Sequence, residues 1–146
     1  MSGWLARHWT IVRWLPALAW MGVIFLLSSQ SGLRVSEDAA VDKPIRLVAH
    51  MASYALLAGL LFYALCGAGR PTARGAGRPT ARGVGRPTAR AATLALVLAT
   101  LYAVSDELHQ AMVPDRTGRP EDVVVDVVGA TIGLAIAAFI LGSGDS

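Results

Sequence analysis

Acids, a histidine and an amide are clustered in the segment Ser105-Asp106-Glu107-Leu108-His109-Gln110. This segment follows one long apolar run, and a second apolar run begins just after Asp122. Ionisable groups beside segments that enter a bilayer are costly unless they are paired or hydrated, so they mark a candidate functional site. Histidines and carboxylates can exchange protons or bind a divalent metal, and arginines such as Arg116 can clamp a phosphate or a carboxylate.

Known catalytic patterns are missing from the chain. It contains no HExxH motif, no GxSxG motif and no group of clustered Cys and His ligands, and its single cysteine is Cys66. The sequence therefore predicts no metal and no cofactor, and it favours a binding protein over an enzyme. If the protein is an enzyme, the candidate catalytic residues are Asp106, Glu107 and His109.

The composition predicts an integral membrane protein. Of the 146 residues, 54% are hydrophobic and 16% are charged, whereas soluble domains have about 25% charged residues. Four long apolar runs predict an all-α, polytopic membrane protein, a single domain over 1–146 built as a bundle of four transmembrane helices. The expected spans are about 11–29, 45–66, 89–108 and 121–141.

The ends of these runs carry further signals. The first run has a rival interpretation as a cleaved signal peptide, with a weak cleavage site at Ser29-Gln30-Ser31. In the second, Asp42 is expected to cap the helix and Pro44 to lie in its first turn. In the fourth, Gly129 and Gly133 form a smooth face for close helix contact, which allows a homo-oligomer.

An eight-residue repeat rich in Gly, Arg and Pro occupies 69–90. Its composition predicts a disordered loop. Of the 13 basic residues six lie in this loop, so the rest of the chain has seven basic and ten acidic residues, a balance of −3 instead of +3. The loop could contact anionic lipid or nucleic acid, but a basic loop usually marks the cytoplasmic side, so we expect membrane lipids and no nucleic acid as partners. Both termini are then expected in the cytoplasm.

With this orientation, the polar ends of all four spans meet at the outer leaflet. His50 lies about 7.5 Å inside the second span, and Asp126 lies one turn below Asp122. Because depth makes an unpaired polar group expensive, we expect these two residues to be functional, and we expect Glu107 and Glu121 to lie at the rim. The alternative is that most of these groups are rim charges in water. The predicted pocket residues are Ser28, Lys43, His50, Tyr54, Asp106, Glu107, His109, Gln110, Arg116, Asp122 and Asp126.

An ordered series of motifs covers nearly the whole chain except the arginine repeat. The motifs are Trp20-Met21-x-x-Ile24-Phe25-x-x-Ser28-Ser29, Asp42-Lys43 with His50-x-x-x-Tyr54, Asp106-Glu107-x-His109-Gln110-x-x-Val113-Pro114-x-Arg116, and Asp122-x-x-x-Asp126-x-x-Gly129-x-x-x-Gly133. In this series the chain resembles the VanZ-like family of small bacterial membrane proteins. Two positions depart from the family pattern: Asp115 replaces a glycine, and Asp126 stands where the family often has asparagine.

The resemblance implies a multi-span protein of the bacterial cytoplasmic membrane that is associated with the cell envelope. The family's namesake is linked to low-level resistance to the glycopeptide teicoplanin, but its mechanism is not settled. We therefore expect a protein that binds a lipid-linked or cell-wall component at an outward-facing polar pocket. The alternatives are a membrane enzyme that acts by acid–base chemistry on a lipid-linked substrate and, with less support, an ion-coupled carrier.

Overall fold

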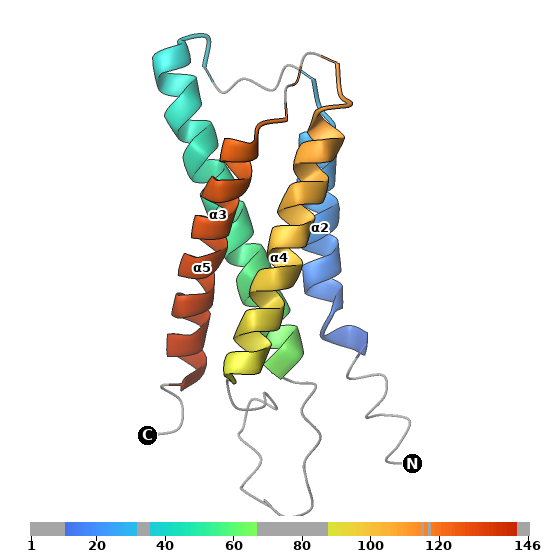
Figure 1. Cartoon of the computed structure of the whole chain (residues 1–146), viewed down its shortest axis with the longest axis vertical. Helices are drawn as coiled ribbons and strands as arrows, with labels where there is room; N and C mark the ends of the chain where they lie inside the picture. The colour runs from blue at the N-terminus through green and yellow to red at the C-terminus, as the bar shows by residue number, and fades with distance from the viewer. Residues whose placement is uncertain (1–10, 32–35, 67–87, 115, 117, 143–146) are drawn as a thin grey trace, which may run out of the picture.

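The computed structural model describes residues 11–31, 36–66, 88–114, 116 and 118–142. This part of the chain is all-helical and contains no strand, which confirms the predicted fold class. Its helices are α2 (Leu15–Ser28), α3 (Ala39–Cys66), α4 (Ala89–Gln110) and α5 (Pro120–Gly142), and they form one bundle (Figure 1). Most of the arginine repeat predicted to be disordered lies outside the described residues.

Three of the described helices, α3, α4 and α5, are long and apolar enough to cross a membrane. The first predicted span is shorter than expected, since α2 has 14 residues and a length of about 21 Å, against about 30 Å for the hydrocarbon core. Ile11 and Val12 are also helical, but a turn at Arg13 and Trp14 separates them from α2. Arg13 is buried there, with its guanidinium 5.6 Å from the centre of the Tyr63 ring.

The start of α3 also differs from the prediction. The helix begins at Ala39, and Asp38 provides its cap because the Asp38 carboxylate accepts the backbone N–H of Ala40 at 2.9 Å. The prediction that Asp42 caps the helix is therefore wrong, and Asp42 instead accepts the backbone N–H of Ser36 at 3.3 Å. Pro44 lies inside the helix, within its first two turns.

Small residues set the packing of α5 against α3, the most extensive helix contact in the bundle. A Cβ atom added to Gly129 would lie 2.7 Å from Cα of Met51, and one added to Gly133 would lie 2.6 Å from Cα of Ala55. The two glycines therefore let the backbones of α3 and α5 touch. The face predicted to allow a homo-oligomer is covered by α3 of the same chain, so oligomerisation would need another surface.

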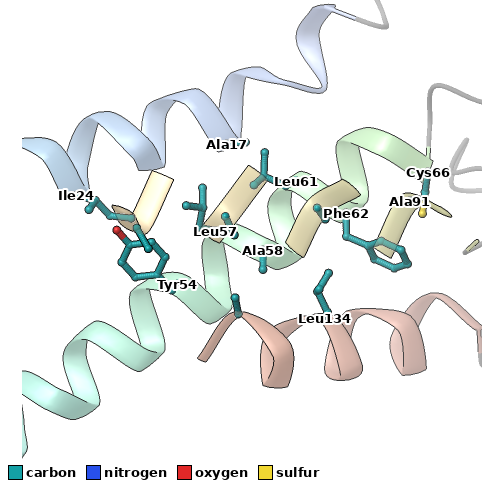
Figure 2. Close-up of a cluster of buried hydrophobic side chains, with 14 residues drawn as sticks. Ala17, Ile24, Tyr54, Leu57, Ala58, Leu61, Phe62, Cys66, Ala91 and Leu134 are labelled. Carbon is teal, nitrogen blue, oxygen red and sulfur yellow. The ribbon is translucent and has the colours of Figure 1, made fainter. Parts of the chain in front are cut away.

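The centre of the bundle is apolar. Leu57, Ala58, Leu61 and Phe62 of α3 pack between the other helices, and Leu134 of α5 lies beside them (Figure 2). On α4 the buried face is a stripe of alanines at four-residue spacing: Ala91, Ala95, Ala99 and Ala103. Small side chains along that stripe allow α4 to approach its neighbours closely.

Hydrogen bonds fix the height of α2 in the bundle. The Trp20 indole N–H donates to the carbonyl of Ser53 on α3 at 3.0 Å, and the Tyr102 hydroxyl of α4 donates to the carbonyl of Met21 at 2.6 Å. As a result, α2 and α4 end at the same end of the molecule at which α3 and α5 begin, at the top of Figure 1. We call this the polar end.

Candidate functional site

Three carboxylates of the described residues are buried at the polar end. The exposed fraction is 3% for Asp106, 6% for Glu107 and 0% for Asp126. Burial of Asp126 agrees with the expectation from its depth. The prediction that Glu107 is a rim residue is wrong, whereas Glu121 is exposed as expected. Buried carboxylates need partners, so the groups around each of them define the site.

Asp106 joins α4 to α2. Its Oδ2 accepts the Ser28 hydroxyl at 2.9 Å and the Gln110 side-chain amide at 3.0 Å, and all three side chains are buried. The other oxygen, Oδ1, is buried and has no hydrogen-bond partner in the described structure. Sequence analysis grouped these three residues by helix end, and the structure brings them into contact.

The loop before α5 covers Glu107. Oε2 of Glu107 accepts the backbone N–H of Arg119 at 2.7 Å, while the Gln110 amide is a longer contact at 3.4 Å from Oε1. A Cβ atom added to Gly118 would overlap the carbonyl oxygen of Glu107. Glycine at position 118 thus lets the loop lie directly on the end of α4. Sequence analysis missed Gly118, whose only signal was its place in a turn before Pro120.

His50 of α3 and Asp126 of α5 form the deepest polar pair. Nδ1 of His50 lies 3.3 Å from Oδ1 of Asp126, and the His50 side chain is 24% exposed. Oδ2 of Asp126 is buried without a partner in the described structure. Glu107 completes a group of three, since one donor atom from each residue lies within 4.8 Å of the others. The sequence predicted the depth of His50 and Asp126 but not their contact with Glu107.

Arg116 links the loop between α4 and α5 to the end of α2. Its Nε donates to the carbonyl of Gln30 at 3.1 Å, its Nη2 to the carbonyl of Leu27 at 3.4 Å, and its Nη1 to Oε1 of Gln110 at 3.2 Å. Burial lowers the pKa of the Arg116 guanidinium below its usual value, and the charge of Arg46 lowers it further. An arginine stays protonated at neutral pH even so, and Arg116 therefore brings a fixed positive charge to this end.

A cavity of about 170 Å³ opens beside these groups, and we call it the arginine cavity. Its lining comes from α2, α3 and Arg116, and consists of Ile24, Leu27, Arg46, Ala49, His50, Ser53, Tyr54 and Arg116. Two side chains are cationic, and most of the remaining wall is apolar. The Tyr54 hydroxyl, next to Ile24 in Figure 2, is buried and has no hydrogen-bond partner in the described structure.

His109 lies apart from the buried carboxylates. Its ring stacks on Phe25 of α2 with the ring centres 4.5 Å apart, and Nε2 lies 2.9 Å from the Ser29 hydroxyl. That hydroxyl donates to the Phe25 carbonyl at 2.7 Å. The imidazole must then donate to Ser29, so it is not placed as a base that would activate this serine. Glu107 and His109 are two residues apart on α4, so their side chains project from the helix about 160° apart.

Two other predicted pocket residues, Lys43 and Asp122, do not join the group of side chains around the buried carboxylates. Lys43 is exposed near the start of α3, and the half-buried Asp122 lies in the first turn of α5. Neither side chain makes a hydrogen bond within the described ranges. The pocket residues that the structure does gather into one connected group are Ser28, His50, Tyr54, Asp106, Glu107, Gln110, Arg116 and Asp126.

Comparison with known proteins yields one match. The family model described as VanZ/LLP1 matches residues 13–141, a range that contains every residue of the site. No curated protein and no solved structure matches the chain.

Proposed function

The chain belongs to the VanZ/LLP1 family, and we propose that it is a cell-envelope protein whose polar end binds the phosphate or carboxylate of a lipid-linked cell-wall component. The observation that carries this proposal is the arginine cavity, in which Arg46 of α3 and Arg116 of the loop share one apolar recess. Guanidinium groups bind phosphate and carboxylate through charge-assisted hydrogen bonds. A recess with two of them favours an anion.

The size and lining of the cavity narrow the ligand to a headgroup. At about 170 Å³ it has the volume of roughly six water molecules, and pockets for drug-sized ligands begin near 300 Å³. Ile24 and Leu27 give it an apolar wall on α2, and neighbouring side chains such as Leu26 are exposed on that helix. An anionic headgroup fits the cavity, with its hydrocarbon chain along α2.

The same volume bears on glycopeptide tolerance. A whole glycopeptide antibiotic is far larger than this cavity, so direct capture of the drug is not what the site supports. We propose that any contribution to teicoplanin tolerance follows from binding a lipid-linked component of the cell wall at an outward-facing polar end. Two observations support this proposal: the family membership and the volume of the cavity.

Binding to a polyprenyl phosphate tests the proposal. Full-length protein in nanodiscs is titrated with polyprenyl phosphate and, in parallel, with the uncharged polyprenol of the same chain length. We expect Arg46→Gln to weaken binding of the phosphate by about tenfold or more, the value of one charge-assisted hydrogen bond. Binding of the polyprenol should stay weak in all proteins.

Lys43→Gln is the matched control. It removes one positive charge from the same helix, one turn from Arg46, at an exposed position outside the cavity. If both variants weakened phosphate binding equally, general charge attraction and not the cavity would bind the lipid. Equal affinity of the unaltered protein for phosphate and polyprenol would also contradict the proposal.

A further inference from the structure

We infer that His50, Glu107 and Asp126 form a binding site for one divalent transition-metal ion. The three residues come from three helices, α3, α4 and α5, and their donor atoms all lie within 4.8 Å of one another. This site goes beyond the proposed function, because metal binding requires no lipid ligand. Sequence analysis predicted no metal, because the chain has no HExxH motif and no clustered Cys and His ligands.

The distances suit a metal after a small movement. A metal bound at about 2.0–2.2 Å from each donor places the donors roughly 3–4 Å apart. The His50–Asp126 pair is already at 3.3 Å, so Glu107 is the group that must approach, by about 1 Å. One imidazole nitrogen and two carboxylate oxygens suit Zn²⁺ or Mn²⁺, and they leave a coordination position open.

Unpartnered polar atoms are a second observation that points to a ligand. Among the described residues, Oδ2 of Asp126 has no hydrogen-bond partner, although the side chain is 0% exposed. The Tyr54 hydroxyl, one turn from His50, is also buried without a partner within the described chain, and it lies in electrostatic range of Asp106 and Asp126. Buried groups in this state are costly. A metal and its bound water would satisfy both.

Charge balance favours a dication in the same place. Glu107 and Asp126 carry two negative charges when they are ionised, and a ligating His50 is neutral. Neither arginine of the cavity forms an ion pair with these two carboxylates within the described residues: Arg116 donates to Gln110 and two carbonyls of the α2 end, and Arg46 lies 4.0 Å from Asp42. A bound 2+ ion would cancel the two carboxylate charges at a site on membrane-spanning helices.

The groups around Glu107 also resemble the outer shell of a metal site. The backbone N–H of Arg119 holds Oε2 at 2.7 Å and thereby fixes the orientation of the carboxylate. Within the part of the chain that the structure describes, Oε1 has only the 3.4 Å contact with Gln110. Hydrogen bonds of this kind orient ligands and raise metal affinity.

The site touches the arginine cavity through His50, which lines it. A metal there would lie beside an anionic headgroup and could complete its coordination with a headgroup oxygen. This consequence rests on the proposed function, whereas the metal site does not.

Metal binding by the purified chain tests the inference directly. Full-length protein with no affinity tag, in detergent, is stripped with a chelator and titrated with Mn²⁺ or Zn²⁺, with metal content measured by mass spectrometry and Mn²⁺ binding by electron paramagnetic resonance. We expect one ion per chain and a melting temperature that rises with metal concentration. His50→Gln, Glu107→Gln and Asp126→Asn should each weaken Mn²⁺ affinity by about tenfold or more.

The matched control variants change residues of the same types as the proposed ligands at positions outside the site. His109→Gln and Glu121→Gln remove a histidine and a glutamate that are outside the site, and they should leave the affinity unchanged. His50→Gln changes a partly exposed side chain, so it keeps the test decisive if Asp126→Asn does not fold.

Two results would overturn the inference. The first is the absence of stoichiometric metal from the unaltered, reloaded protein. The second is loss of stability in His50→Gln and Asp126→Asn without any effect of metal on the unaltered protein, which would make the pair a structural ion pair. Arg46→Gln separates the two proposals, because it should weaken lipid binding and leave Mn²⁺ binding intact.

Discussion

Two adjacent serines at the end of α2 have opposite environments. Ser28 is 6% exposed and donates its hydroxyl to Asp106 across the helix contact. Ser29 is exposed, and its hydroxyl returns to the carbonyl of Phe25 in its own helix. The Ser28 hydroxyl is one of two groups in the described structure that donate to the Asp106 carboxylate, and the other is the Gln110 amide. Water can take over the hydrogen bonds of the exposed Ser29 hydroxyl.

Ser28→Ala is expected to destabilise the protein by about 1–3 kcal/mol, because it leaves the buried Asp106 carboxylate with a lost hydrogen bond. Ser29→Ala should change stability by less than about 0.5 kcal/mol, as is usual at exposed positions. The free energy of unfolding in mixed micelles, followed by circular dichroism, measures both. Similar losses in the two variants would show that Asp106 does not depend on Ser28.

Individual site residues were predictable only where the reason was local. Counting turns placed His50 and Asp126 deep in their helices, and the structure buries Asp126 fully. Glu107 was misplaced at the rim because its burial depends on a loop eleven and twelve positions later, through Gly118 and Arg119. Such a contact between distant segments leaves no periodic signal in the sequence.

At the scale of helices, the apolar runs predicted the bounds of α4 and α5 to within two residues. The predicted starts of α2 and α3 were wrong, because a single polar residue sets where each of these helices begins. The end of α4 at Gln110 lies two residues beyond the predicted limit. In contrast, α3 begins at Ala39 because Asp38 caps it, and α2 is shortened by the turn at Arg13. Hydropathy describes which segment enters the apolar layer but not which residue caps it.

The contact between α3 and α5 depends on glycine. Gly129→Ala and Gly133→Ala should each destabilise the bundle by about 1–3 kcal/mol, since the added methyl group meets the backbone of Met51 or Ala55 and forces the helices apart. Unfolding in mixed micelles measures the loss. Gly22→Ala on α2 is the matched control, since its added Cβ meets no atom of the described residues within 4 Å.

The control should be neutral or stabilising by up to about 1 kcal/mol, because alanine is the better helix former. If all three substitutions behaved alike, the close approach of α3 and α5 would contribute nothing to stability. The GxxxG spacing itself was visible in the sequence. Its partner was not, because the spacing is the same for a contact within one chain and a contact between chains.

At the scale of the whole molecule, the polar groups of the site gather at one end of the bundle in the described part of the chain. The buried carboxylates, both histidines of the site region and the arginine cavity all lie at the polar end, and the middle of the bundle is apolar. Membrane-embedded charge is tolerated where helices enclose it. The proposed ligand and the inferred metal would therefore meet the protein from the same side of the membrane.

The orientation of the whole bundle in the membrane can be tested on α4. The basic loop before α4 predicts that the start of the helix faces the cytoplasm and that the polar end faces outward. Ala89 is exposed at the start, Met112 is 76% exposed just past the other end, and α4 spans about 32 Å between them. In a Cys66→Ala background, a membrane-impermeant maleimide should label Met112→Cys in intact cells and Ala89→Cys only after permeabilisation. The reverse pattern would place the arginine cavity in the cytoplasm and exclude a ligand on the outer leaflet, and labelling of both positions in intact cells would contradict a membrane-spanning α4.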